Sequence, residues 1–199
     1  MKYKDNIEAL LQLQPDFIGF IFYPNSKRFV NEELNETNIH NIPASITKVG
    51  VFVNETKDNI ISICKKYRIE TIQLHGEENQ DFCKTLKETG LSVIKAFSIG
   101  ETFNFDTLAN YNTSCNFFLF DTKGDNYGGT GIKFDWEVLK GKEIKLPYFL
   151  SGGIDLTDAT SILNSDFLNI FSIDINSKFE LAPGVKDIEK IKQFKLLLQ

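Results

Sequence analysis

The stretch "FFLFDTKGDNYGGTG", residues 117–131, carries the clearest fold signal in the sequence. It begins with a run of bulky apolar residues that stops at Asp121, and a loop with four glycines follows. The run is apolar at successive positions and does not alternate with polar residues, which is typical of a strand in a parallel sheet covered on both faces. The stretch therefore predicts a buried strand that delivers one carboxylate to its end and opens into a glycine-rich loop.

Six further apolar runs of this kind occur at roughly even intervals along the chain. They are "FIGFIF" (17–22), "KVGVFV" (48–53), "TIQLHG" (71–76), "SVIKAF" (92–97), "PYFLSGG" (147–153) and "LNIFSID" (168–174). Helical patterns precede the first run and cover residues 57–69, 77–90, 155–164 and 186–198, whereas residues 31–47 show little periodicity. Strands that alternate with helices predict βαβ units and a parallel sheet.

Two architectures fit this alternation, an open doubly wound sheet and a (β/α)8 barrel. Seven predicted strands with one helix ahead of the first resemble a TIM barrel whose first strand is not in this chain. No linker or low-complexity stretch divides the sequence, so we expect a single domain over residues 1–199.

Composition restricts the kinds of partner. The formal net charge of −5 argues against binding to nucleic acid or an anionic membrane surface, where a basic patch is expected. The three cysteines form no CxxC pair, and the chain has no apolar stretch near 20 residues. These observations predict a cytoplasmic protein without a membrane span. A small anionic ligand stays possible, because backbone N–H groups alone can hold a phosphate.

Polar residues follow the predicted strands at their carboxyl ends, where barrels of this kind place their chemistry. Loops after the last two strands commonly bind phosphate, and glycines let the backbone approach a ligand closely. The residues at these positions are Arg28, His75, Asp121, Ser151, Gly152, Gly153, Asp174, Asn176 and Ser177, with the Gly128–Gly131 loop as a further contributor.

Several residues also have a simpler interpretation. Asp121 could cap a loop or pair with Lys123, His75 could be a supporting residue, and Arg28 could be a solvated surface cation. Trp136 fits a packing role. Cys64 and Cys83 fall on the apolar faces of helices, which favours the core.

Taken together, the motifs resemble one family, the phosphoribosylanthranilate isomerases of tryptophan biosynthesis. The matching stretches are "PDFIGFIFYPNSKRFV", "KVGVFVN", "IQLHG", "FDTKGDNYGGTGIKFDW", "FLSGGI" and "SIDINSKFELAPGVKD", in the family's order and spacing. The resemblance implies an Amadori rearrangement of N-(5-phosphoribosyl)anthranilate to 1-(2-carboxyphenylamino)-1-deoxyribulose 5-phosphate, an isomerisation of the aldose–ketose type. It implies no metal or redox cofactor, and a monomer or homodimer.

The resemblance also assigns roles to residues. Asp121 matches the general acid, which must be protonated when the substrate is bound, and we expect Phe118 and Phe120 to wall it with apolar surface. Arg28 matches the residue near the anthranilate carboxylate. The phosphate loops match Gly152, Gly153, Asn176 and Ser177, and the remaining predicted substrate-binding residues are His75, Gly129 and Asp174.

Two departures from the family pattern stand out. Lys178 replaces a glycine, which predicts either a strained turn or an added cation near the phosphate. Family members also begin with a strand that ends near "KICG", whose cysteine is the general base, whereas this sequence starts just after that motif. None of the three cysteines falls at the carboxyl end of a predicted strand: Cys64 and Cys83 are on helices, and Cys115 lies just before a strand. We therefore expect an N-terminally truncated isomerase that lacks its first strand and its base.

Three alternatives stay open at this point. The chain could be an inactive barrel that still binds the ligand. It could be another phosphosugar enzyme, such as an epimerase or an aldolase-type lyase, which would need a metal cluster or a strand-end lysine, for which Lys95 is the candidate. It could be a scaffold domain, which would not explain an acid and two phosphate loops at the same strand ends.

Overall fold

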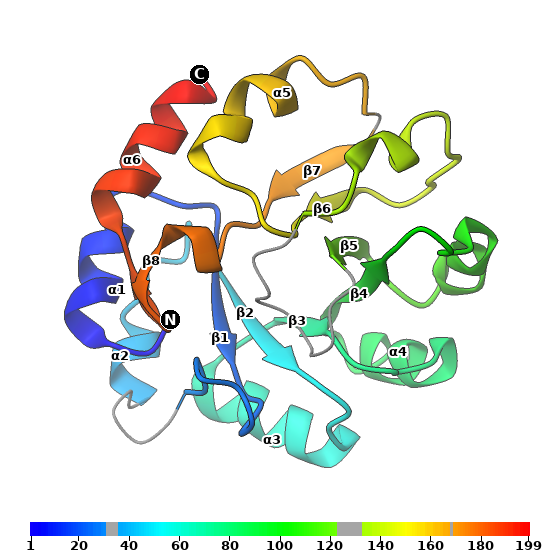
Figure 1. The fold of residues 1–199 in the computed structure, drawn as a ribbon. Coiled ribbons are helices and arrows are strands. Elements are labelled where there is room, and N and C mark those ends of the chain that lie inside the picture. The colour runs from blue at the N-terminus through cyan, green and yellow to red at the C-terminus, as the bar shows by residue number, and fades with distance from the viewer. Residues whose placement is uncertain (31–35, 123–132, 168) are drawn as a thin grey trace.

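The computed structural model describes residues 1–30, 36–122, 133–167 and 169–199. Its centre is a sheet of seven parallel strands whose order in space follows the chain (Figure 1). The strands are β1 (Phe17–Ile21), β2 (Thr47–Phe52), β3 (Thr71–Leu74), β4 (Ser92–Ile99), β5 (Phe117–Thr122), β6 (Tyr148–Leu150) and β7 (Ile170–Ile173). Every predicted apolar run overlaps one of them, so the parallel α/β prediction is confirmed.

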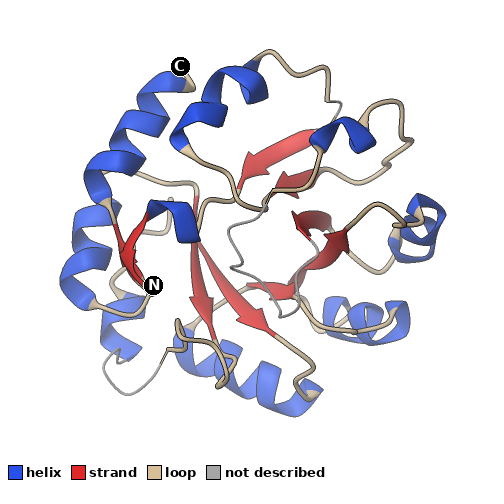
Figure 2. Ribbon diagram, viewed as in Figure 1, coloured by secondary structure: helices blue, strands red, loops and turns tan. Residues whose placement is uncertain are grey.

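Helices lie around the outside of the curled sheet (Figure 2). The α-helices are α1 (Lys4–Leu11), α2 (Glu36–His40), α3 (Lys57–Tyr67), α4 (Gln80–Lys87), α5 (Ala159–Leu163) and α6 (Ile188–Leu197). Capping explains where two of them begin: the side chain of Thr56 accepts from the Asn59 N–H at the start of α3, and Asn79 accepts from Phe82 at the start of α4. Their buried faces carry Cys64 and Cys83, as the sequence predicted.

Three features differ from the sequence prediction. The connections after β4 and β5 contain the 3₁₀ helices η1 (Phe105–Tyr111) and η2 (Trp136–Leu139), where the alternation of strands and helices would place α-helices. Asparagine and aspartate side chains bond the backbone at both starts, which competes with α-helical hydrogen bonds. Helix α2 was not predicted, because it buries one residue, Ile39, and so shows no periodicity. The predicted helix over residues 155–164 consists of a 3₁₀ helix, η3 (Leu156–Asp158), followed by α5, and a further 3₁₀ helix, η4 (Ser177–Phe179), follows β7.

The two faces of the sheet bury different cores. Phe118 and Phe120 face the helices in the larger, outer cluster, whereas Leu119 belongs to a smaller, inner cluster with Val49, Ile94, Ala96 and Phe149. In the interior of the curl, the ring of Phe17 on β1 lies 5.1 Å from that of Phe149 on β6. The sheet is therefore curled far enough for its first strand to contact its sixth across the interior.

The described residues show no pairing between β1 and β7, so an eight-stranded barrel is not seen. The free edge of β1 is partly covered. The carbonyl of Gly19 accepts from the Met1 amino group at 2.8 Å, and the carbonyl of Ile21 accepts from Val30 N–H at 2.8 Å. The hairpin of β8 (Glu180–Ala182) and β9 (Val185–Lys186) lies beside α1 (Figure 1). None of the described helices is long and apolar enough to span a membrane.

Candidate active site at the carboxyl ends of the strands

His75 and Asp121 meet at the carboxyl ends of β3 and β5. The imidazole Nε2 lies 3.4 Å from Oδ2 of Asp121, and both side chains are about 12% exposed. The amide nitrogen of Gln73 lies 2.7 Å from Nδ1 of the same ring. An amide nitrogen can only donate, so Nδ1 accepts and Nε2 carries the proton that faces the carboxylate. A second Asp121 oxygen accepts from Thr122 N–H at 2.8 Å.

The prediction that Phe118 and Phe120 surround Asp121 with apolar surface is wrong. Side chains alternate along a strand, so Asp121 shares the inner face with Leu119, whereas Phe118 and Phe120 point to the opposite face beneath the helices. The carboxyl group is still buried, at 8% exposure, because it closes the carboxyl end of the inner core. A run that is apolar on both faces gives no signal for which residues point inward, which explains the error.

The glycine pair after β6 packs directly against the end of β5. Gly152 has φ +91°, and a Cβ added to it would lie 2.4 Å from Oγ1 of Thr122 and 3.3 Å from Oδ1 of Asp121. Gly153 also has a positive φ, +63°. The position of Gly152 thus requires glycine both for its backbone conformation and for the close approach. The structure brings this loop and Asp121 to the same end of the sheet.

Asp174 follows β7 and completes this group of carboxylates. The hydroxyl of Ser151 donates to its Oδ2 at 3.2 Å. Burial raises the pKa of Asp174; the positive charge of Lys186 opposes the rise, and the carboxylate of Asp121 adds to it. Asp121 and Asp174 therefore lie within electrostatic reach of each other, and the ends of β3, β5, β6 and β7 converge.

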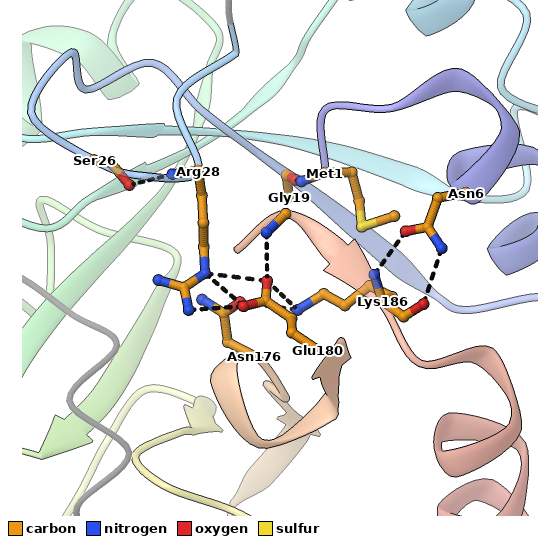
Figure 3. Close-up of polar contacts among 9 residues, drawn as sticks. Met1, Asn6, Gly19, Ser26, Arg28, Asn176, Glu180 and Lys186 are labelled. Atoms are coloured by element: carbon orange, nitrogen blue, oxygen red, sulfur yellow. Dashed lines mark hydrogen bonds and ion pairs between the residues drawn. The ribbon is translucent and has the colours of Figure 1, made fainter. Parts of the chain in front are cut away.

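Arg28, in the loop after β1, is paired with Glu180 of β8 (Figure 3). Lys186 of β9 donates to Oε1 of Glu180 at 3.3 Å and to Oδ1 of Asn176 at 2.8 Å. Burial lowers the pKa of Lys186. Burial would raise the pKa of Glu180, but the Arg28 hydrogen bonds and the Lys186 charge outweigh it, so this pKa is lowered. Sequence reasoning had singled out neither Glu180 nor Lys186, although Lys186 stands in the "PGVKD" motif.

The remaining residues from the sequence analysis are Ser177, Lys178, Gly129 and the three cysteines. Ser177 begins η4, immediately after Asn176. Lys178 is exposed and does not have a positive φ, so the predicted turn strain is absent. Gly129 lies outside the described residues. All three cysteines are buried away from the carboxyl ends of the strands: Cys64 on α3, Cys83 on α4 and Cys115 before the start of β5.

Comparisons with known proteins point to one family. The family model for N-(5'-phosphoribosyl)anthranilate (PRA) isomerase matches residues 1–195. The N-(5'-phosphoribosyl)anthranilate isomerase of Parabacteroides distasonis is 41% identical over 197 residues, which are 98% of this chain and 88% of that protein. The crystal structure of phosphoribosyl anthranilate isomerase from Thermotoga maritima superposes with a TM-score of 0.87 at 31% identity, covering 100% of this chain and 95% of the other.

A further crystal structure adds ligand information. It is that of a phosphoribosyl anthranilate isomerase in complex with reduced 1-(o-carboxyphenylamino)-1-deoxyribulose 5-phosphate, and it matches with a TM-score of 0.85 at 28% identity, covering 100% of this chain and 94% of that one.

Proposed function

The chain belongs to the N-(5'-phosphoribosyl)anthranilate isomerase family, and from this membership we propose how its strand ends carry out the reaction. The activity is the Amadori rearrangement of N-(5-phosphoribosyl)anthranilate to 1-(2-carboxyphenylamino)-1-deoxyribulose 5-phosphate, a step of tryptophan biosynthesis. An acid protonates the ribose ring oxygen and opens the ring to a Schiff base. A base then removes the C2 proton, and the resulting enolamine tautomerises to the ketone.

Asp121 is the general acid in this proposal. The observation that carries the assignment is its position: a buried carboxyl group at a strand end, next to His75 and in contact range of the Gly152 loop. Asp174 lies within electrostatic reach of Asp121, because the Asp121 carboxylate adds to the rise that burial gives the pKa of Asp174. The Nε2–H of His75 faces Oδ2 of the Asp121 carboxyl group at 3.4 Å and so favours one orientation of it.

The substrate is anionic at both ends, and the proposal gives each end a subsite. Backbone N–H groups around Gly152 and Gly153, with Asn176 and Ser177, bind the phosphate. Arg28 binds the anthranilate carboxylate, since a guanidinium fork matches a planar carboxylate. The loops that carry these residues follow β6, β7 and β1, which supports one continuous site at the open end of the curl.

The base that removes the C2 proton is none of the chain's three cysteines. Burial raises the pKa of Cys64 to about 12, and Cys83 and Cys115 contact each other beneath the helices. This observation favours a second candidate function for the 199-residue chain: binding of the phosphosugar without turnover. The two candidates share the binding site and differ only in the proton abstraction step.

A lyase or epimerase with a strand-end lysine is disfavoured by the surroundings of Lys95. Its Nζ donates to the carbonyls of Leu74 and Gly76 and lies 3.0 Å from Oε2 of Glu78. Lys95 alternates with Ile94 and Ala96 of the inner cluster, so it points to the helix side of the sheet. In the part of the chain that the structure describes, no group of three or more His, Cys, Asp and Glu residues could hold a metal ion.

The test measures binding and turnover separately on the 199-residue chain. Calorimetric titration with reduced 1-(o-carboxyphenylamino)-1-deoxyribulose 5-phosphate should show saturable binding at one site. Turnover of N-(5-phosphoribosyl)anthranilate, measured by separating substrate and product, decides between isomerase and binding protein. Absence of both binding and turnover in a folded sample would contradict the proposed function.

A further inference from the structure

The guanidinium of Arg28 is held along one of its two edges (Figure 3). Its Nε lies 3.0 Å from Oε1 and 2.8 Å from Oε2 of Glu180, and its Nη2 lies 2.7 Å from Oε2. This is the side-on arrangement, which uses the Nε–H and one Nη2–H. A guanidinium has five N–H groups, so the three on the Nη1/Nη2 edge are left over. No described residue provides a hydrogen-bond partner for Nη1.

Glu180 is itself fixed in place. Its side chain is 4% exposed, and its Oε1 accepts from the N–H of Gly184 at 3.2 Å and from Nζ of Lys186 at 3.3 Å. Lys186 is held in turn, because the side chain of Asn6 both donates to its carbonyl at 2.9 Å and accepts from its N–H at 2.7 Å. A carboxylate restrained from several sides stays on Arg28 when a second anion arrives.

The same network reaches the other end of the site. Lys186 Nζ donates to the side-chain oxygen of Asn176, in the loop after β7. A chain of polar contacts therefore runs from Arg28 through Glu180 and Lys186 to Asn176. Along the sequence, the first pair is separated by 152 residues, the second by 6 and the third by 10. The network ties the loop after β1 to the loop after β7 although β1 and β7 do not pair.

We propose that Glu180 is a positioning residue that holds Arg28 side-on so that its Nη1/Nη2 edge faces the anthranilate carboxylate, and that Lys186 sets the spacing between this edge and the phosphate loop. The inference rests on the proposed function, since it takes Arg28 as the carboxylate-binding residue. A bidentate, charge-assisted pair is strongly directional, so an arginine free to rotate would lose most of its preference for a carboxylate.

The experiment compares two ligands. One is reduced 1-(o-carboxyphenylamino)-1-deoxyribulose 5-phosphate, and the other is the same molecule with a phenyl ring that lacks the carboxylate. Dissociation constants are measured for the full chain, for Glu180→Gln and for Glu189→Gln, an exposed control on α6. We expect the full chain and the control to prefer the carboxylate ligand by roughly 10- to 100-fold, and Glu180→Gln to reduce this preference to a few-fold with little change for the phenyl ligand.

Other outcomes separate the possibilities. If Glu180→Gln weakens the binding of both ligands equally, or if it leaves the preference for the carboxylate ligand unchanged, the positioning role is overturned and the proposed function stands. A full chain that binds both ligands equally removes Arg28 from carboxylate binding and overturns both.

Two further variants complete the test. Lys186→Met should weaken the binding of both ligands by a similar factor, because it loosens the loop that carries Asn176. A change in the dissociation constant of only one ligand would contradict the spacing role. If Glu180→Gln fails to fold, the variant Glu180→Gln/Lys186→Met, which removes one charge of each sign, is titrated in its place. Thermal unfolding confirms that each protein is folded before the titration.

Discussion

The imidazole Nε2 of His75 lies 3.4 Å from Oδ2 of Asp121, although His75 follows β3 and Asp121 lies near the end of β5, and β4 separates these two strands in the sheet. In a flat sheet, two side chains that far apart would not meet. The contact exists because the sheet curls and both side chains point to its inner face. Curvature of the sheet is thus a condition for the proposed acid and its supporting imidazole to act together.

The first prediction concerns Asp121→Asn. The amide keeps the shape of the carboxyl group but does not donate a proton as a carboxylic acid does, so kcat should fall by about 10²–10⁴-fold. The dissociation constant of the reduced product analogue should change by only a few-fold. Asp58→Asn, at an exposed position in the first turn of α3, is the control. If the Asp121→Asn protein has a kcat within a few-fold of the parent, Asp121 is not the general acid. If the parent itself shows no turnover of the substrate, binding of the analogue is the remaining measurement.

The second prediction concerns His75→Ala. His75→Ala removes the Nε2–H that faces Oδ2 of Asp121 at 3.4 Å, so the carboxyl group keeps only the hydrogen bond from Thr122 N–H, and loss of a polar partner by a buried group costs about 1–3 kcal/mol, which corresponds to a roughly 5- to 100-fold lower kcat. KM should change much less. The chain has two histidines, so His40→Ala on α2 serves as the matched control. A large rise in KM with unchanged kcat would instead make His75 a ligand-binding residue.

The third prediction uses two glycines with nearly the same backbone conformation. Gly152 has φ +91° and a Cβ there would meet Thr122, whereas Gly90 has φ +95° and nothing within 4 Å of an added Cβ. Gly90→Ala should lower the free energy of unfolding by about 1 kcal/mol from backbone strain alone. Gly152→Ala should lower it by about 1–3 kcal/mol more, because the ends of β5 and β6 must separate. Urea unfolding measures both; equal losses would show that the contact with Thr122 is easily relieved.

Much of this arrangement could be predicted from the sequence, because each apolar run marks a strand and the residues just after the run lie at that strand's carboxyl end. Asp121, His75 and Gly152 are therefore recognisable from local pattern alone. The partners of Arg28 are not, since Glu180 lies 152 residues away and pairs with it only after the hairpin β8–β9 packs beside α1. The inward direction of Asp121 also requires the structure, because a run that is apolar on both faces leaves the orientation of its side chains undetermined.

The fourth prediction concerns Lys95, which is 3% exposed and pairs with Glu78, 7% exposed. Lys95→Met leaves a buried carboxylate without its cation and should lower the free energy of unfolding by about 3–5 kcal/mol. Lys65→Met on the exposed side of α3 should have little effect. Lys95→Met/Glu78→Gln should recover part of the loss, which a double-mutant cycle quantifies. Trapping of Lys95 by borohydride in the presence of substrate would contradict this structural role and favour a lyase.

The last prediction concerns the raised pKa of Asp174, whose causes are burial first and then the nearby Asp121 carboxylate against the Lys186 charge. The unfolded chain releases this proton near the ordinary value of 3.8, and the folded chain releases it at a higher pH. Between these two values the folded state binds more protons, so the free energy of unfolding falls as pH rises through the window. Asp174→Asn removes this dependence.

The difference in free energy of unfolding between Asp174→Asn and the parent should therefore shift in favour of the variant from about pH 4 upward and then level off above the raised pKa. Ser151→Ala is the control, because Ser151 donates to Asp174 and its loss should give an offset of about 1 kcal/mol with a much weaker pH dependence. Urea unfolding at half-unit steps from about pH 3.5 to 7.5 measures all three proteins. A difference that is flat across this range would show that Asp174 ionises as freely in the folded chain as in the unfolded one, and that the carboxylates at the ends of β5 and β7 do not act on each other.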